Sequence, residues 1–445
     1  MDTRVAPLSE LQGKFKSKTA LVGVIGLGYV GLPICVAACE VGFKVLGLDI
    51  DPAKPEAINR GQSYLKHIPA PRIGKLVDQG LLTATADFSR LSEPDALLIC
   101  VPTPLTSHLD PDLSFVVSTA EQIAKRLRRG QIVILESTTY PGTTLEVLRP
   151  ILETSGLKCD RDFYIAYSPE REDPGNLEFS TSRIPKVIGA DCPEAQDAAA
   201  ALYDNFVPAT IKVSSCATAE AVKLTENIFR AVNIALVNEL KIVYGAMGID
   251  IWEVIDAAKT KPFGFMPFYP GPGLGGHCIP IDPFYLTWKA REYGITTRFI
   301  ELAGQINTAM PQHVVNELAR QLDTRSGRGL KDARILVVGV AYKKNVEDIR
   351  ESPALRLMEL LEERGAHVAY YDPHVPVIPD TRHHRALAGR PSQSWGGFSS
   401  YDAVLIATDH DGIDYAELAK TARLIVDTRN ACRRAGVVAA NIVSA

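Results

Sequence analysis

The sequence contains no apolar run near the ~18 residues of a membrane span, and residues 1–20 lack the apolar core of a secretion signal. It has no excess of positive charge: a net charge of -4 gives no general attraction to nucleic acid or anionic lipid. The eight cysteines are scattered, without the pairing density of a disulfide framework or a C-x-x-C zinc spacing. These absences predict a cytoplasmic protein with reduced thiols, no metal site, and neither nucleic acid nor membrane as partner.

What is present is an ordinary globular composition. The 445 residues are 46% hydrophobic and 22% charged. A chain of this kind can bury sizeable cores in two to three domains of about 100 to 200 residues each.

A strand, a glycine turn, a helix and a second strand follow one another from residue 20. The apolar run 20–25 ends in Gly26-Leu27-Gly28-Tyr29-Val30-Gly31, and the strand 44–49 ends in Asp49. Gly26 permits the tight turn, Gly28 lets backbone N–H groups approach a pyrophosphate, and Gly31 brings the helix close to the sheet. Asp49 is expected to accept hydrogen bonds from ribose hydroxyls and to repel a 2′-phosphate, which favours NAD over NADP.

Further strand patterns at 96–101, 132–136 and 163–167, with helical patterns between them as in 118–129, predict a doubly wound α/β domain that reaches about residue 210. The loops after these strands carry Thr103, Thr138 and the pair Glu170-Arg171. In such sheets ligands meet the loops at the carboxyl ends of the strands. Thr103 and Thr138 are equally typical of turns and helix caps.

Residues 214–247 contain no proline and have apolar positions near helical spacing, so they predict one long helix that joins two domains. Lys223 and Asn227 are four residues apart and therefore share a face. Taken alone, they are also typical of solvent-exposed helix residues. The proline- and glycine-rich run 261–271 predicts an ordered functional loop.

A second α/β unit begins at residue 333, with strands predicted at 333–341, 366–373, 403–408 and 424–427. Its glycine fingerprint is replaced by a segment that contains Lys343, Lys344 and Arg350, so cations are expected to meet phosphates there. His383 and His384 have no spaced carboxylate or cysteine set and are interpreted as surface histidines.

Cys278 lies in the glycine-dense run 273–283, with Asp282 four positions on. Most cysteines in such chains are small buried hydrophobes. Together with a dinucleotide fingerprint, however, a thiol in this setting suggests an oxidation that passes through an enzyme-bound acyl group.

The glycine turn, the Val101–Pro104 loop, Ser137-Thr138, Ser168-Pro169-Glu170, Lys223 with Asn227, Gly275–Cys278 with Asp282, and Lys343 through Ser352 occur in this order. Together they resemble the UDP-glucose/GDP-mannose dehydrogenase family. The resemblance implies an α/β fold with two Rossmann-like doubly wound domains joined by a long central helix and a helical dimerisation region. The expected boundaries are an arm at 1–19, an NAD-binding domain at 20–212, a central domain with the cysteine loop at 213–325, and a UDP-binding domain at 326–445.

The resemblance also implies roles for individual residues. Cys278 is expected to be the nucleophile, Lys223 and Asn227 the donors to the developing oxyanion, Glu170 or a water ordered by Thr138 the base, and Asp282 a group that orients Lys223 or a water. NAD is expected to contact the turn Gly26–Gly31, Asp49, Thr103, Thr138 and Arg350. The UDP-sugar is expected to contact Glu170, Arg171, Lys223, Asn227, Phe263, Gly275, Lys343 and Arg429.

The runs 168–176 and 262–273 look like the branch that oxidises C6 of UDP-N-acetylglucosamine to the uronic acid by a four-electron reaction, for surface polysaccharide synthesis. Lys261-Pro262-Phe263 stands where the glucose-specific relatives have an arginine, which puts a glucose substrate in doubt. UDP-glucose and UDP-N-acetylgalactosamine remain alternatives, as do a two-electron β-hydroxy acid dehydrogenase and a non-catalytic sensor of nucleotide sugar and NAD. A homodimer or higher homo-oligomer through the long helix is expected.

Overall fold

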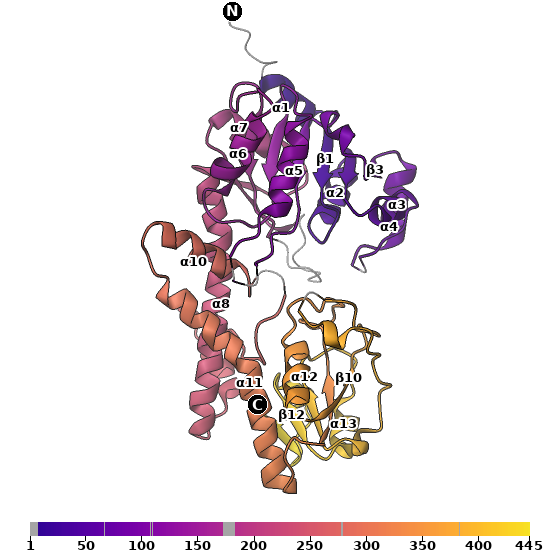
Figure 1. Ribbon diagram of the computed structural model, residues 1–445, viewed down its shortest axis with the longest axis vertical. Helices are drawn as coiled ribbons and strands as arrows, with labels where there is room; N and C mark the ends of the chain where they lie inside the picture. Colours follow the sequence, from indigo (N-terminus) through magenta and orange to yellow (C-terminus); the bar gives the residue numbers. More distant parts are fainter. Residues whose placement is uncertain are drawn as a thin grey trace, which may run out of the picture. The chain divides into compact units, whose positions relative to one another are not determined.

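The computed structural model describes residues 8–65, 67–106, 108, 110–171, 183–276, 279–381 and 383–445. The chain separates into two compact units, each with its own sheet (Figure 1). The first unit holds Met1–Glu226 and Phe284–Ile295, and the second unit holds Asn227–Pro283 and Thr296–Ala445.

The first unit is built on an eight-stranded sheet in the order β3-β2-β1-β4-β5-β6-β7-β8. Its strands are β1 (Leu21–Ile25), β2 (Lys44–Leu48), β3 (Leu82–Thr85), β4 (Ala96–Ile99), β5 (Ile132–Leu135), β6 (Tyr164–Tyr167), β7 (Lys186–Gly189) and β8 (Thr210–Val213). β6 and β7 pair antiparallel, and the other neighbouring strands pair parallel. The order of β1 to β6 is that of dinucleotide-binding domains, so the predicted doubly wound fold is confirmed.

Both faces of this sheet are buried, because successive side chains of a strand point to opposite faces. In β4, Ala96 and Leu98 join a core with residues of α2 (Gly31–Glu40) and α7 (Pro193–Tyr203). Leu97 and Ile99 join a second core with residues of α5 (Ser114–Ala124). The other helical segments of this unit are α1 (Leu8–Lys16), α3 (Ala53–Asn59), α4 (Ala70–Asp78), η1 (Phe88–Ser92), η2 (Thr144–Leu148) and α6 (Arg149–Glu153).

The prediction of a helix at 118–129 was wrong in its bounds. α5 begins at Ser114, whose backbone N–H donates to Asp112 Oδ1 at 3.0 Å, and it ends at Ala124. After it, the Arg128 N–H donates to Gln131 Oε1 at 2.8 Å instead of to a helical carbonyl. Local side chain to backbone bonds of this kind compete with helix continuation.

The second unit holds a parallel five-stranded sheet in the order β10-β9-β11-β12-β13. Its strands are β9 (Arg334–Val338), β10 (His367–Tyr371), β11 (Ala403–Ile406), β12 (Ile425–Asp427) and β13 (Ile442–Ser444). Its short helices are α9 (Ile251–Ala258), α12 (Pro353–Glu363), η4 (Arg385–Leu387), η5 (Phe398–Ser400), α13 (Tyr415–Thr421) and α14 (Ala431–Arg434). The second predicted α/β domain is therefore also present.

The long helix predicted at 214–247 is α8 (Cys216–Ala246), and α10 (Asp282–Glu292) and α11 (Arg298–Ser326) follow it. Within the second unit, α8 and α11 are joined by buried amides: Asn238 Nδ2 donates to Asn307 Oδ1 at 2.9 Å, and Asn307 Nδ2 donates to the Ala231 carbonyl at 3.0 Å. Among the helices of the described residues, none is both long enough and apolar enough to span a bilayer.

Candidate functional site

The turn between β1 and α2 has glycine where the backbone demands it and open space where a ligand would need it. Gly26 has a φ of +93°, and a Cβ there would lie 2.6 Å from the Cys100 carbonyl oxygen. A Cβ at Gly31 would lie 1.9 Å from the Gly26 oxygen, so the close approach of α2 excludes any larger residue. A Cβ at Gly28 would meet no atom within 4 Å. This arrangement fits a dinucleotide pyrophosphate beside Gly28 at the start of α2.

Asp49 follows β2 and is 5% exposed. Its Oδ2 accepts from the Leu27 N–H at 2.8 Å and from Lys54 Nζ at 2.9 Å, while Oδ1 accepts from the Asp51 N–H at 3.0 Å. The carboxylate therefore fixes the glycine turn to the end of β2. That position suits an acceptor for ribose hydroxyls, and the contact itself stays a prediction.

The loops after β4 and β5 are joined to each other. Ser137 Oγ donates to the Val101 carbonyl at 2.7 Å, and the Tyr285 hydroxyl of α10 donates to the Thr103 carbonyl at 2.9 Å. The loop that carries Thr138 continues to Gly142, whose N–H donates to Glu220 Oε2 at 2.6 Å. Thr103 is buried and Thr138 is half-buried, and both lie at the carboxyl edge of the sheet as predicted.

Glu220 of α8 was missed by the sequence analysis. It is fully buried and also accepts from the N–H and the hydroxyl of Thr144, at 2.9 and 2.7 Å. Burial raises the pKa of the Glu220 carboxyl to about 7. Glu220 thus ties the loop of Thr138 to the helix that carries Lys223. A single glutamate in a helical pattern gives no sequence signal for this role.

Glu170 and Arg171 follow β6, and both have partners in the first unit. Glu170 Oε2 lies 3.1 Å from Lys186 Nζ. Arg171 donates from Nη1 to the Pro185 carbonyl at 2.7 Å and from Nη2 to Glu226 Oε1 at 2.6 Å. These bonds give Arg171 a structural role in holding the loop, and its predicted contact with substrate is untested.

Lys223 and Asn227 lie one turn apart on α8 and are only 7% and 3% exposed, so the solvent-exposed alternative was wrong. Asn227 Nδ2 donates to Asp282 Oδ2 at 2.5 Å, and Asp282 is 2% exposed. The structure therefore gives Asp282 the amide of Asn227 as one partner, and its predicted role of orienting Lys223 or a water stays a prediction. This bond orients the Asn227 side chain.

Cys278 and His277 lie outside the described residues, but the glycine run that leads to them is described. The Gly271 N–H donates to Asn238 Oδ1 at 3.0 Å, and the Gly276 N–H donates to the Arg350 carbonyl at 3.0 Å. A Cβ at Gly275 or at Gly276 would lie 2.8 Å from the Tyr342 side chain. Gly275 is therefore explained by close packing on the segment 342–353, and its contact with substrate stays a prediction.

Four further residues that were predicted to contact NAD or the UDP-sugar lie in the second unit: Phe263, Lys343, Arg350 and Arg429. Arg350 Nη2 pairs with Asp348 Oδ2 at 2.6 Å, and Arg429 Nε donates to the Ala407 carbonyl at 2.9 Å. A Cβ at Gly271 would lie 2.6 Å from Arg429 Nη1, so Arg429 packs against the glycine run. Lys343 is half-buried and Phe263 is 71% exposed. The structure brings Arg429 and the backbone of Arg350 to the glycine run, and the contact of Phe263 with the sugar stays a prediction.

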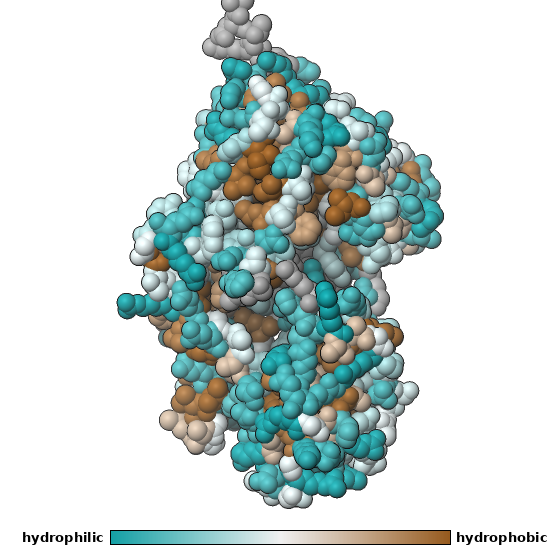
Figure 2. Space-filling model, in the orientation of Figure 1, coloured by the Kyte–Doolittle hydropathy of each residue, from teal (hydrophilic) through white to brown (hydrophobic). Residues whose placement is uncertain are grey.

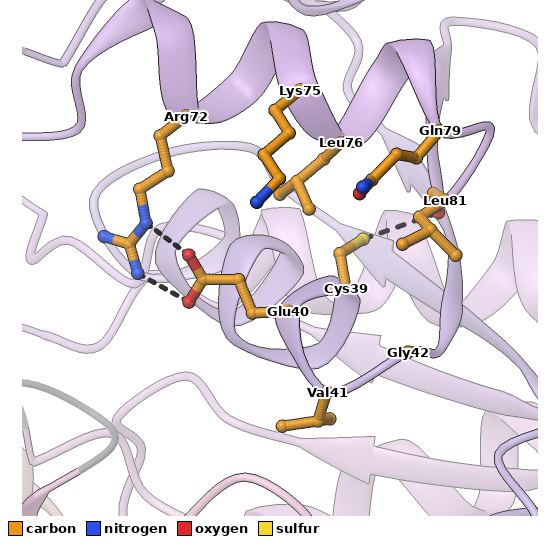
Figure 3. A pocket seen from close by; sticks show the side chains of 9 residues that line it. All are labelled: Cys39, Glu40, Val41, Gly42, Arg72, Lys75, Leu76, Gln79 and Leu81. Atoms are coloured by element: carbon orange, nitrogen blue, oxygen red, sulfur yellow. Dashed lines mark hydrogen bonds and ion pairs between the residues drawn. The ribbon is translucent and has the colours of Figure 1, made fainter.

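A separate surface hollow lies between the end of α2 and α4, as Figure 3 shows. Arg72 pairs with Glu40 through two bonds of 2.6 and 2.7 Å, and Cys39 Sγ donates to the Leu81 carbonyl at 3.4 Å (Figure 3). Burial raises the pKa of the Cys39 thiol to about 12. None of the predicted site residues lines this hollow.

The glycine turn at β1, the buried acid after β2 and a second α/β unit define an NAD-dependent dehydrogenase that also has a nucleotide-binding domain. The chain belongs to the UDP-glucose/GDP-mannose dehydrogenase family. The family's NAD binding domain matches residues 20–207, its central domain matches residues 217–309, and its UDP binding domain matches residues 336–434. NAD is therefore the cofactor, and the family resemblance drawn from the sequence is confirmed.

Individual relatives agree over nearly the whole chain. A UDP-N-acetyl-D-glucosamine 6-dehydrogenase of Pseudomonas aeruginosa is 38% identical over 397 residues, which are 88% of this chain and 91% of the relative. A UDP-N-acetyl-D-mannosamine dehydrogenase of Pyrococcus horikoshii is 35% identical over 419 residues, 92% and 95% of the two chains. A solved structure of a UDP-D-ManNAc dehydrogenase from Pyrococcus horikoshii superimposes with a TM-score of 0.85 at 33% identity, covering 95% of this chain and 98% of that one.

Proposed function

We propose that the protein oxidises the C6 hydroxymethyl group of UDP-N-acetylglucosamine to the carboxylate, by an NAD-dependent four-electron reaction that passes through Cys278. The structural observation that carries this proposal is the buried bond between Asn227 and Asp282, with Asp282 four residues after Cys278. An amide donor held by a buried carboxylate in this way is suited to meet negative charge that develops on a substrate oxygen.

The thiol is needed because an aldehyde has no hydride to give until a nucleophile makes its carbon tetrahedral. The thiolate of Cys278 adds to the C6 aldehyde and forms a C–S bond, and the product is a thiohemiacetal. Oxidation of that species leaves a thioester, and water then breaks the C–S bond to release the acid and the free thiol. NAD supplies the hydride acceptor, and two NAD are consumed for each sugar.

The other residues have roles that follow from charge and position. Lys223 and Asn227 share a face of α8 and would donate to the C6 oxygen as it becomes negative. Positive charge on Lys223 would also favour the thiolate of Cys278. Glu170, or a water ordered by Thr138, would take the proton in the alcohol oxidation and in hydrolysis of the thioester. Asp282 fixes the orientation of the Asn227 amide.

An N-acetylated sugar is favoured over glucose by two observations. Lys261-Pro262-Phe263 replaces the arginine expected in glucose-specific relatives. The Phe263 ring is exposed, and its centre lies 4.9 Å from Lys261 Nζ. The relatives from Pseudomonas aeruginosa and Pyrococcus horikoshii are named for N-acetylglucosamine and N-acetylmannosamine. We propose the gluco epimer because the relative from Pseudomonas aeruginosa is 38% identical to this chain and the relative from Pyrococcus horikoshii is 35% identical.

The stoichiometry of the reaction tests this proposal. Incubation of the protein with excess NAD and limiting UDP-N-acetylglucosamine should yield two NADH per sugar, with the uronic acid detected by mass spectrometry. Matched reactions with UDP-N-acetylmannosamine, UDP-N-acetylgalactosamine and UDP-glucose compare the specificity constants. One NADH per sugar would indicate a two-electron dehydrogenase, and no NADH with any of the four would favour a non-catalytic sensor.

We also propose that the protein forms a homodimer through α8. Phe229, Leu236 and Val243 recur at intervals of seven residues on α8 and are 48%, 50% and 41% exposed. Figure 2 shows apolar surface near the carboxyl end of α8. Met247 and Ile249, which follow α8 in the sequence, are 66% and 45% exposed. An exposed apolar stripe of this kind is typical of a protein interface.

Replacement of Leu236 by Asp together with Val243 by Asp should weaken the dimer about 100-fold, because two charges would be buried without partners. Sedimentation velocity over a range of concentrations measures the change in dissociation constant. Val438→Asp is the matched control, because Val438 is 87% exposed and lies outside the stripe. An unchanged dissociation constant in the double variant would place the interface elsewhere.

A further inference from the structure

Two acidic side chains of the first unit share one buried ammonium group at the carboxyl edge of its sheet. Lys186 Nζ lies 2.7 Å from Glu136 Oε2 and 3.1 Å from Glu170 Oε2. The Tyr203 hydroxyl donates to the other oxygen of Glu136. The three charged residues come from the end of β5, the start of β7 and the loop after β6. The antiparallel pairing of β6 with β7 is what places the start of β7 beside that loop.

The two acids differ in their access to solvent. The side chains of Glu136 and Lys186 are 0% and 4% exposed, whereas that of Glu170 is 11% exposed. Glu136 therefore faces only protein groups, and Glu170 is the member of the cluster that an external molecule can approach. One ammonium cannot neutralise two carboxylates, so the charge of each acid affects the proton affinity of the other.

We propose that Lys186 and Glu136 are positioning residues that control the ionisation of Glu170, with Lys186 keeping the Glu170 carboxylate charged and Glu136 competing for the same ammonium. This inference rests on the proposed function, in which Glu170 is a candidate base. It assigns a catalytic consequence to two buried residues that have no contact with substrate in the proposed mechanism.

The surroundings of the cluster support these separate roles of Lys186 and Glu136. Burial raises the pKa of the Glu136 carboxyl, whereas the Lys186 ammonium and the Tyr203 hydroxyl, which both donate to this carboxyl, favour its charged form. The groups that face Glu136 are Lys186 from β7, Glu170 from the loop after β6, Tyr203 from α7 and Cys100 at the end of β4. The two carboxylates raise the pKa of the Lys186 ammonium, which therefore stays charged.

Neighbouring bonds hold Glu170 within reach of Lys186. The Arg171 N–H donates to Glu170 Oε1 at 2.8 Å, and Arg171 Nη1 donates to the carbonyl of Pro185, the residue before Lys186. The Lys186 ammonium also lies 5.2 Å from the centre of the Tyr203 ring. Each end of the Glu170–Lys186 contact is therefore fixed by the backbone beside it.

Two substitutions should move the acid limb of the kcat against pH profile in opposite directions. Lys186→Met removes the cation, raises the pKa of Glu170 and shifts the limb upward by about one pH unit. At pH values below the limb it should lower kcat about tenfold, because a tenfold smaller fraction of Glu170 is ionised there, whereas kcat on the plateau above the limb should change little. Glu136→Gln removes the competing acid, lowers the pKa of Glu170 and shifts the limb downward. Lys186→Arg keeps the charge and should restore most of the activity.

The KM for the UDP-sugar should stay within about threefold of wild type in all three variants. A purely structural role of the cluster would change the amount of folded protein but would leave the acid limb in place, and that result would overturn the inference. If Lys186→Met does not fold, the downward shift in Glu136→Gln remains a full test, because this substitution only replaces a carboxyl by an amide of the same shape.

A second measurement separates this inference from the proposed function. The titration of Glu170 can be followed without turnover by ¹³C NMR of selectively labelled glutamate carboxyls, with the resonance assigned by its loss in Glu170→Gln. Opposite pKa changes in Lys186→Met and Glu136→Gln would support the control of Glu170 even if no UDP-sugar is oxidised. Unmoved titration curves would overturn it even in an active enzyme.

Discussion

Replacement of Cys278 by Ser should abolish uronic acid formation, with a fall of at least about 1,000-fold in the steady-state release of NADH, while binding of the UDP-sugar is kept. The serine hydroxyl has nearly the shape of the thiol but is a far weaker nucleophile at neutral pH, so the aldehyde would not be captured. Steady-state NADH formation and mass spectrometry of the sugar measure the loss. Isothermal titration calorimetry measures the retained affinity for the UDP-sugar.

Cys192→Ser is the matched control for this experiment. Cys192 Sγ accepts from the Ala195 N–H at 3.3 Å at the start of α7, and serine is a good residue in that capping position. This control should therefore keep wild-type activity. Unchanged turnover in Cys278→Ser would end the thioester proposal, whereas a loss of UDP-sugar binding would show that Cys278 serves the fold of the site.

The second large effect is expected at Gly276. Its φ of +86° is unfavourable for alanine, and the added Cβ would lie 2.8 Å from the Tyr342 ring. Either the ring or the glycine run must move, and the run leads directly to Cys278. Since a misplacement of about 1 Å can cost about 100-fold in rate, we expect Gly276→Ala to lower kcat by about that factor.

Gly264→Ala provides the control for the backbone contribution. Gly264 has a φ of +70°, and a Cβ there would meet no atom within 4 Å, so this variant has comparable backbone strain without the collision. Activity assays and thermal unfolding of both variants separate the two causes. If Gly264→Ala and Gly276→Ala lose the same activity, the contact with Tyr342 has no special importance for the cysteine run.

The strongest sequence signals were those that depend on local backbone requirements. The glycine turn was predicted in full because Gly26 and Gly31 are dictated by close approach, and α8 was predicted because its apolar spacing continues without a proline. β3, β7 and β8 were not predicted. Polar residues or glycine interrupt these three strands (LTAT, KVIG and TIKV), whereas β4 and β5 have the same length but are apolar throughout (ALLI and IVIL). The missed strands therefore lack a continuous hydrophobic pattern.

The charged partners of the candidate site could not be predicted, because each pair joins distant parts of the sequence. Glu136 and Lys186 are 50 residues apart, and Asn227 and Asp282 are 55 residues apart. The first pair depends on the antiparallel direction of β7 relative to β6, and the direction of such a short strand cannot be predicted from its sequence. The second depends on the return of the chain from α8 to α10. Motif order identified Asp282 and Asn227 as important without revealing that they are bonded.

Arg171 on Pro185 and Glu170 on Lys186 form a clamp between the loop after β6 and the start of β7. The backbone pairs these two strands through Tyr167 and Gly189. The clamp therefore adds side-chain contacts to a short backbone pairing. Its loss should let β7 and β8 separate from the sheet before the rest of the unit unfolds.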